Sequence, residues 1–316
     1  MSSTPTSTAT RSYSTRELQA AAAALAAGRF STTGTQPRTG PTAQPVPPAD
    51  EKGITSGAQE PAIAPADDVA FDGSVQTAAV ATGLEPLVRV RAANAGAGAS
   101  TIALALADAA DAAGVRARVL DAAAPAWSGL LGATATELGA AEGWRRGRRG
   151  TSVLIDRVED RVQAPADVPS PRAVDGIGLT VLDAGWSMRE LAAACESGAW
   201  LATTPARVEV IVTRPHGLAL SQTEAALADL EEQLAAGQVV VVVVGANRWS
   251  DREFATAGRR LREAHQQEAV LFAPLLAPKA LPGLGPDPLP KQLTHPSQHL
   301  LERITTITGP LTANRT

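Results

Sequence analysis

From about residue 84 to the end of the chain, short apolar runs alternate with longer stretches of helical pattern. The clearest run is a series of valines that ends just before Gly245. A strand that is apolar on both sides has to be covered on both faces, which is typical of a parallel sheet between two layers of helices. The sequence therefore predicts a single α/β domain over residues 84–316, with a mostly parallel sheet and helices on both faces.

The pattern also predicts the individual elements of this domain. The expected strands cover residues 87–92, 115–121, 178–185, 207–215, 238–249 and 269–276. The expected helices cover residues 100–113, 188–195, 221–237, 251–266 and about 297–307.

Residues 1–83 have a different composition. Between 31 and 80 they are mostly Ser, Thr, Gly, Pro, Gln and Ala, which cannot bury enough apolar surface to offset the entropy of ordering. We predict a disordered arm with one short helix near 14–30, where Ser14 and Glu17 have capping-box spacing and Gly28 ends the helix. Such a helix is marginal alone, so it is either without a role or a docking segment for a protein partner.

Charge and cysteine content exclude several classes of protein. A net charge of −4 gives no global reason to bind nucleic acid. The single cysteine, Cys195, excludes a disulfide framework or a cysteine-based zinc site, and we expect it to pack in the core. The apolar runs are too short to span a bilayer, and the first residues do not form a signal peptide. We therefore expect a cytoplasmic protein without a transmembrane segment.

The connection after the first expected strand is rich in glycine and reads NAGAGAST over residues 94–101. Two glycines let backbone amides approach a phosphate, and the start of a helix favours an anion. A dinucleotide-binding fold would need a third glycine where Thr101 stands, although Asp121 has the spacing of a ribose-binding acid. A P-loop instead expects Ser or Thr at the end of the loop, as Ser100 and Thr101 supply.

At this point the sequence resembles the ParA/MinD-like partition and positioning ATPases, whose deviant Walker A loop reads K-G-G-x-G-K-[ST]-T. The segment 121–132 looks like their switch segment, and VLDAG places Asp183 at the Walker B position. VVVGANRW looks like the strand that ends in an Asn-Arg pair, where Asn247 would read adenine, and Pro274 falls at the base-binding turn. The resemblance covers about residues 85–305 and implies a P-loop NTPase-like fold.

The resemblance implies a set of site residues. Nucleotide or phosphate contacts are expected at Gly96, Gly98, Ala99, Ser100, Thr101, Asn247 and Pro274. Ser100 and Asp183 would hold Mg²⁺, and only together with a bound nucleotide. No catalytic residue is assigned.

The family's charged groups are missing. Its signature lysine is Asn94 here, its Walker lysine is Ala99, and the second acid of its switch segment is Ala123. Only Lys52, Lys279 and Lys291 are lysines in the whole chain, and none lies near the loop in sequence. Phosphoryl transfer depends on positioning and charge neutralisation, so we expect hydrolysis to be lost or very weak. Two arginines of the first expected strand, Arg89 and Arg91, are candidates for compensation, although their side chains are expected to point the wrong way.

Arg145, Arg146, Arg148 and Arg149 form the densest cluster of charge. They could meet the phosphates of DNA or another anionic partner, or they could form a solvated loop that Asp156, Glu159 and Asp160 neutralise. The four histidines lack metal-ligand spacing, apart from His295 and His299, which are four residues apart.

These observations favour a non-hydrolysing or weakly nucleotide-binding scaffold or spatial regulator, acting in partition, division positioning, secretion or conjugation. ATP or ADP with Mg²⁺ would bind weakly, and a homodimer and protein partners are expected. One alternative is an active ATP-dependent ParA/MinD-type switch. The other is a Rossmann-type enzyme that uses a dinucleotide.

Overall fold

The computed structural model describes residues 84, 86–277 and 283–312 of the 316-residue chain. The predicted arm over residues 1–83, with its helix near 14–30, lies outside the described residues, so that prediction is not tested.

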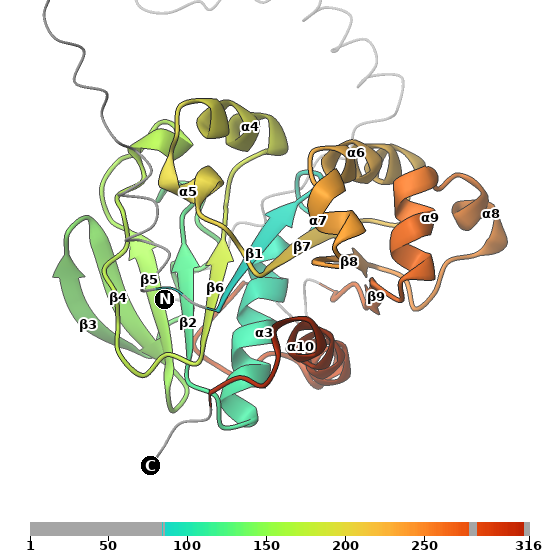
Figure 1. Ribbon diagram of the computed structural model, residues 1–316. Helices are drawn as coiled ribbons and strands as arrows, with labels where there is room; N and C mark the ends of the chain where they lie inside the picture. The colour runs from blue at the N-terminus through green and yellow to red at the C-terminus, as the bar shows by residue number, and fades with distance from the viewer. Residues whose placement is uncertain (1–83, 85, 278–282, 313–316) are drawn as a thin grey trace, which may run out of the picture. The chain divides into compact units, whose positions relative to one another are not determined.

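A nine-stranded sheet forms the centre of the domain, in the order β3-β4-β5-β2-β6-β1-β7-β8-β9 (Figure 1). All neighbouring strands from β5 to β9 are parallel, whereas β4 pairs antiparallel with both β3 and β5. The strands are β1 (Leu87–Ala92), β2 (Ala117–Asp121), β3 (Thr136–Ala141), β4 (Trp144–Arg149), β5 (Val153–Val158), β6 (Leu179–Asp183), β7 (Val208–Thr213), β8 (Val239–Val244) and β9 (Val270–Ala273). The predicted fold class is confirmed.

Helices cover both faces of this sheet (Figure 1). One face, called the α3 face below, carries α3 (Ala99–Ala112) and α10 (Thr294–Thr308), together with the 3-10 turn η2 (Lys291–Leu293). The other, the α4 face, carries α4 (Met188–Glu196), α5 (Trp200–Thr203), α6 (Gly217–Ala228), α7 (Glu231–Ala235), α8 (Asp251–Ala255), α9 (Arg259–Gln266) and the 3-10 turn η1 (Pro165–Asp167).

The two faces have different cores. On the α3 face, one continuous cluster extends from Val153 on β5 to Leu271 on β9. On the α4 face there are two separate clusters. The first, the α4 core, packs α4 and α5 against β2 and β6 around Leu191 and Leu182. The second, the α6 core, packs α6, α7 and α9 against β7 and β8 around Leu227 and Val241. The strand β1 lies between these two cores.

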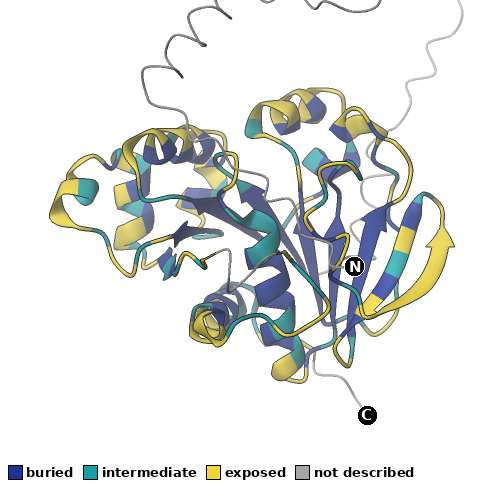
Figure 2. Cartoon of the chain, turned by 180° about the vertical axis from the view of Figure 1, so that it is seen from behind, coloured by how far each residue is buried: buried dark blue, intermediate teal, exposed yellow. Residues whose placement is uncertain are grey.

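The strands β3, β4 and β5 were not predicted. β3 has no β-branched residue beyond Thr136 and is exposed along its whole length, so it forms the outer edge of the sheet (Figure 2). Its pairing with β4 shifts between Glu137 and Gly139, which is a bulge. β4 contains the arginine cluster, so the predicted loop is wrong, whereas the predicted neutralisation by Asp156 and Glu159 is present in the structure.

Two predicted helices are each divided in two. The segment 221–237 becomes the end of α6 followed by α7, and 251–266 becomes α8 and α9. The second division has a clear cause, because the carboxylate of Glu224 accepts the N–H groups of Arg260 at 2.9 Å and Leu261 at 3.0 Å. These bonds satisfy the first amides of a new helix. A Cβ atom at Gly258 would lie 2.3 Å from the carboxyl carbon of Glu224, so a larger residue there would displace this carboxylate.

Candidate phosphate-binding site

The glycine loop lies at the carboxyl edge of the sheet, between the end of β1 and the start of α3. Gly96 and Gly98 have φ angles of 69° and 102°, which glycine adopts without strain. Gly98 is the N-cap of α3, and no side chain caps this helix. Within the described residues, the amides of residues 98–101 donate no hydrogen bond. Four free amides at a helix N-terminus are the arrangement that binds an anion.

Two buried carboxylates lie beside the loop. Asp121 ends β2 and Asp183 ends β6, and the two are direct neighbours in the sheet. Both are at most 1% exposed. Burial raises the pKa of Asp121 to about 6, although hydrogen bonds from Ser128 and the Ala123 amide oppose the shift. Burial and the neighbouring Asp121 charge raise the pKa of Asp183 to about 7.

The surroundings of Asp183 fit a cation. Neither of its carboxylate oxygens has a hydrogen bond of good geometry within the described residues, although the Ser100 hydroxyl and the Gly185 amide lie close enough to lower its pKa. A buried carboxylate without a partner is costly, and a bound divalent cation would remove that cost. Oxygen donors are the ligands that Mg²⁺ prefers. The structure thus brings the two predicted metal ligands, Ser100 and Asp183, together; their role stays a prediction.

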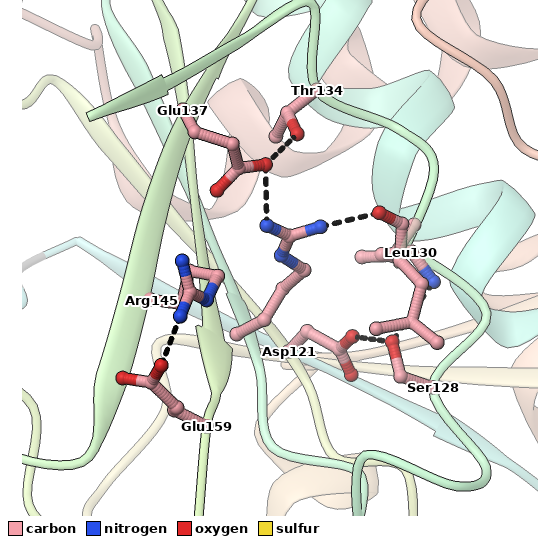
Figure 3. A network of polar contacts seen from close by, with 9 residues as sticks. Asp121, Ser128, Leu130, Thr134, Glu137, Arg145 and Glu159 are labelled. Carbon is pink, nitrogen blue, oxygen red and sulfur yellow. Dashed lines mark hydrogen bonds and ion pairs between the residues drawn. The ribbon is translucent and has the colours of Figure 1, made fainter. Parts of the chain in front are cut away.

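The switch segment, residues 121–132, folds over the first turn of α3. The Ser128 hydroxyl donates to Asp121 (Figure 3). A Cβ atom at Gly129 would lie 3.1 Å from the Ser100 hydroxyl, so this segment touches the predicted metal ligand. Gly185 has a φ of 68°, and a Cβ there would lie 2.5 Å from that of Ala123, which brings the ends of β2 and β6 into close contact.

An arginine from β5 holds this segment in place. The guanidinium of Arg157 donates to the Leu131 carbonyl and, at 2.6 Å, to Glu137. Glu137 also accepts from the Thr134 hydroxyl at 2.5 Å (Figure 3). Arg157 is 5% exposed and is the register neighbour of Asp121. The switch segment is therefore fixed at both ends by polar contacts.

The side chains at the two positions where the family has lysine carry no positive charge. Ala99 is half-buried and packs against the apolar cluster on the α3 face, and Asn94 accepts from the Thr213 hydroxyl at 3.4 Å. The arginines considered as substitutes, Arg89 and Arg91, are buried on the α4 face and pair with Glu209. The expectation that they point away from the loop agrees with this placement.

An arginine that the sequence did not single out reaches the loop instead. Arg214 follows β7, and its Nε and Nη2 atoms donate to the Gly96 carbonyl at 3.2 and 2.9 Å. It is half-buried, and its Nη1 atom lies 3.6 Å from where a Cβ of Gly245 would be. It is the only arginine or lysine of the described residues with a hydrogen bond to residues 94–101. No local pattern marks it, because its partner lies 118 residues away.

The predicted base-binding residues lie farther along the same edge. Asn247 is exposed in the loop after β8, and Pro274 is half-buried directly after β9. Since β8 and β9 are neighbours, the two residues fall on adjacent strand ends. Their contact with a base stays a prediction.

The arginine cluster is mostly occupied within the chain. Arg149 is 2% exposed and donates to Asp108 and to the carbonyls of Gly285 and Asp287. Arg146 pairs with Asp156 through two hydrogen bonds of 2.6 and 2.7 Å. Arg145 pairs with Glu159 (Figure 3). Among the described residues, Arg148 has no ion pair and is exposed, so it is the member of the cluster open to a partner.

Other candidate chemistry is weak. Cys195 is exposed on α4, so the prediction that it packs in the core was wrong. His295 and His299 lie on α10 with ring centroids 6.3 Å apart. Over residues 84, 86–277 and 283–312, no group of three His, Cys, Asp or Glu side chains could hold a metal ion. No helix in the same ranges is long and apolar enough to cross a membrane.

Comparisons with known proteins found matches among solved structures. No family model and no curated protein matches the chain. Among solved structures, one similar to this chain is the cell division protein MinD of Aquifex aeolicus. It is 14% identical over 72% of this chain and 99% of that chain, with a TM-score of 0.46. The cell division ATPase MinD of Pyrococcus furiosus is 18% identical over 71% of this chain and 99% of that chain, with a TM-score of 0.46. A ParA family ATPase of Chlorobium tepidum is 14% identical over 69% of this chain and 99% of that chain, with a TM-score of 0.44.

Proposed function

We propose that this protein is a ParA/MinD-like scaffold or spatial regulator that binds ATP or ADP with Mg²⁺ weakly and hydrolyses ATP very slowly or not at all. One observation carries the proposal: the loop keeps four free amides and a buried acid pair, but residue 99 is a methyl group where the family has an ammonium. The amides supply attraction for phosphate, and the missing charge removes transition-state stabilisation.

The two alternative functions require different contacts from the residues of this site. A dinucleotide-dependent enzyme would need Asp121 to accept hydroxyls of a ribose, but Asp121 is fully buried and already accepts from Ser128 and Ala123. An active ATP-dependent switch is favoured by Arg214, which could supply the charge that Ala99 lacks if it left the Gly96 carbonyl.

Partners belong to the same proposal. A solved MinC:MinD cell division complex of Aquifex aeolicus is among the similar structures, and so is a partition protein. By this likeness we propose that the protein binds a protein partner in partition, division positioning, secretion or conjugation, and by the sequence resemblance that it forms a homodimer. The helix that the sequence predicts near 14–30 is a candidate docking segment, and Arg148 is the member of the arginine cluster that we propose for contact with DNA.

Titration with a fluorescent ATP analogue, with and without Mg²⁺, together with a phosphate-release assay, tests the proposal. We expect weak, Mg²⁺-dependent binding and negligible turnover. The double variant Asn94→Lys, Ala99→Lys should gain about tenfold in affinity, the worth of one charge-assisted hydrogen bond. Ala95→Lys is the matched control, because it adds charge to an exposed loop position where the family has glycine.

Each alternative has its own outcome. Turnover at the rate of ordinary ATPases, lost in Arg214→Ala, would establish the active switch and overturn the proposal. Tighter binding of NAD than of ATP would overturn both. If the double variant gains no more than Ala95→Lys, the alignment of the loop with a Walker A motif is wrong.

A further inference from the structure

A second polar site lies on the α4 face, between its two apolar cores. There β1 and β7 do not present apolar side chains but Arg89, Arg91 and Glu209. The residues above them come from α4, α5 and the turn between α6 and α7, and they leave a cavity of about 650 Å³. This cavity is on the opposite face of the sheet from α3 and takes no part in the phosphate site.

The floor of the cavity is a cluster of three buried charges. Arg89 Nη1 donates to Glu209 Oε1 at 2.8 Å, and Arg89 Nη2 donates to the Thr204 carbonyl. Arg91 Nη2 donates to the same Glu209 oxygen at 3.2 Å. Arg91 Nε lies 2.9 Å from Glu209 Oε2, but the two are not aligned for a hydrogen bond. Two guanidinium groups thus share one carboxylate, which leaves one excess positive charge.

Hydrogen-bonding capacity also remains unused on this floor. The Nε atoms of Arg89 and Arg91 and the Thr204 hydroxyl are buried and have no partner within the described residues. Arg91 Nη1 likewise has no hydrogen bond there, and the Arg91 side chain is 10% exposed. Thr204 is 1% exposed and lines the cavity. All these groups can donate to an anion, and the acceptor Glu209 Oε2 is likewise buried without a hydrogen bond within the described residues.

Stability alone does not account for such a cluster. Burial lowers the pKa of Arg89 despite the neighbouring Glu209, which reflects the cost of desolvating the charge. Apolar side chains of similar volume usually serve a buried position as well as an ion pair or better. In this protein, apolar side chains at these positions would join the two apolar cores of the α4 face into one. The charged cluster therefore points to a role other than stability.

We propose that this cavity binds a small molecule or a chain end that carries a single carboxylate group. One carboxylate neutralises the excess charge of the floor and accepts from Arg91 Nη1 and the Thr204 hydroxyl. The mouth carries the exposed carboxylates of Glu196 and Asp229, which disfavour a second negative charge on the ligand. The site therefore selects monocarboxylates, especially those with a cationic or neutral remainder, over phosphate and polyanions.

Thermal unfolding of the whole protein, with single L-amino acids, trialanine or trialanine amide added at millimolar concentration, tests the proposal. We expect a saturable rise in Tm with a ligand that has a free carboxylate, and none with the amide or with inorganic phosphate. A response to free amino acids alone identifies a small metabolite, and a response to trialanine alone identifies a peptide C-terminus. If no carboxylate raises Tm, or if trialanine amide acts as well as trialanine, the proposal is overturned.

Two variants separate binding from folding. Thr204→Val removes the unpartnered hydroxyl at nearly constant volume, so the protein should fold and lose about fivefold in carboxylate affinity, the worth of one hydrogen bond. The triple variant Arg89→Leu, Arg91→Leu, Glu209→Leu should fold and lose the response completely. Ser221→Ala, on the exposed side of α6, is the control that should respond like the wild type. An unchanged carboxylate response in the triple variant would place the ligand elsewhere and overturn the proposal.

Discussion

The Arg89–Glu209–Arg91 cluster and the Asp121–Asp183 pair both lie on the central strands of one sheet. The first has an excess of positive charge and the second an excess of negative charge. In the first, two cations share one anion and nearly every charge has a partner. In the second, two anions are register neighbours, and neither oxygen of Asp183 has a hydrogen-bond partner within the described residues. The α4 face thus pairs most of its buried charge within the chain, whereas the acid pair at the carboxyl edge of the sheet has an excess of negative charge.

Breaking the paired cluster should have the largest effect. Glu209→Leu leaves two buried guanidinium groups without their anion, so we expect the free energy of unfolding to fall by about 3–5 kcal/mol. Denaturant unfolding measures this loss. Adding Arg89→Leu and Arg91→Leu should restore most of it, since the cost lies in the unpaired charge. Glu159→Leu is the control, because the side chains of that carboxylate and its partner Arg145 are 33% and 45% exposed, and its loss should be within about 1 kcal/mol. An equal loss of unfolding free energy in the two single variants would contradict the expected difference between the buried cluster and an exposed ion pair.

The acid pair should show itself in the pH dependence of stability. The pKa values of Asp121 and Asp183 are raised to about 6 and about 7 from an ordinary value of 3.8, so between these limits the folded state binds more protons than the unfolded state. Their contribution to stability therefore falls as pH rises from about 4 to about 7 and is constant above.

The variant Asp183→Asn isolates the contribution of Asp183 to this pH dependence. The amide has no charge to desolvate and no repulsion with Asp121, so the variant should be more stable than the wild type at pH 8 and similar at pH 4. Denaturant unfolding at the two pH values gives the difference, with Asp175→Asn, at an exposed position, as the control. A wild type that loses nothing relative to Asp183→Asn between pH 4 and pH 8 would mean that the pair is not strained.

A bound cation should offset the excess negative charge of the Asp121–Asp183 pair. At pH 8, with ADP present throughout, we expect Mg²⁺ to raise the Tm of the wild type, by an amount that corresponds to about 1.4 kcal/mol when its concentration is ten times its dissociation constant. The Asp183→Asn variant should not respond. Stabilisation of both proteins to the same degree would show that Mg²⁺ acts elsewhere.

The smallest effect concerns the one hydroxyl that supports the pair. Ser128→Ala removes the donor to Asp121, and we expect a loss of about 1 kcal/mol at pH 8, where the carboxylate is charged. The loss should shrink at pH 4, where Asp121 is protonated. Ser221→Ala removes only a hydroxyl bonded to the Gly217 carbonyl on an exposed surface, and it should have no comparable pH dependence.

The sequence predicted what depends on local pattern. Continuous apolar runs predicted the parallel strands β1, β2, β6, β7, β8 and β9, and the glycines at 96 and 98 marked the start of α3. It missed β4 because a strand rich in arginine looks like a solvated loop until Arg146 meets Asp156 and Arg149 meets Asp108.

Long-range contacts also account for what was missed at the two sites. Arg214 and its acceptor Gly96 are 118 residues apart, and Arg89 and Glu209 are 120 residues apart. Nothing near Arg214 in sequence distinguishes it from the chain's other arginines. Only the parallel pairing of β1 with β7 brings these residues together.

The contact between Ala123 and Gly185 limits the charge that this edge of the sheet can accept. Ala123 is 4% exposed, lies against Gly185 and donates its amide to Asp121. An acid introduced at position 123 would be a third anion near two carboxylates whose pKa values are already raised. A compensating cation, such as a lysine introduced at position 99, would therefore have to be present first. The two charges can be added to this protein in that order but not in the reverse order.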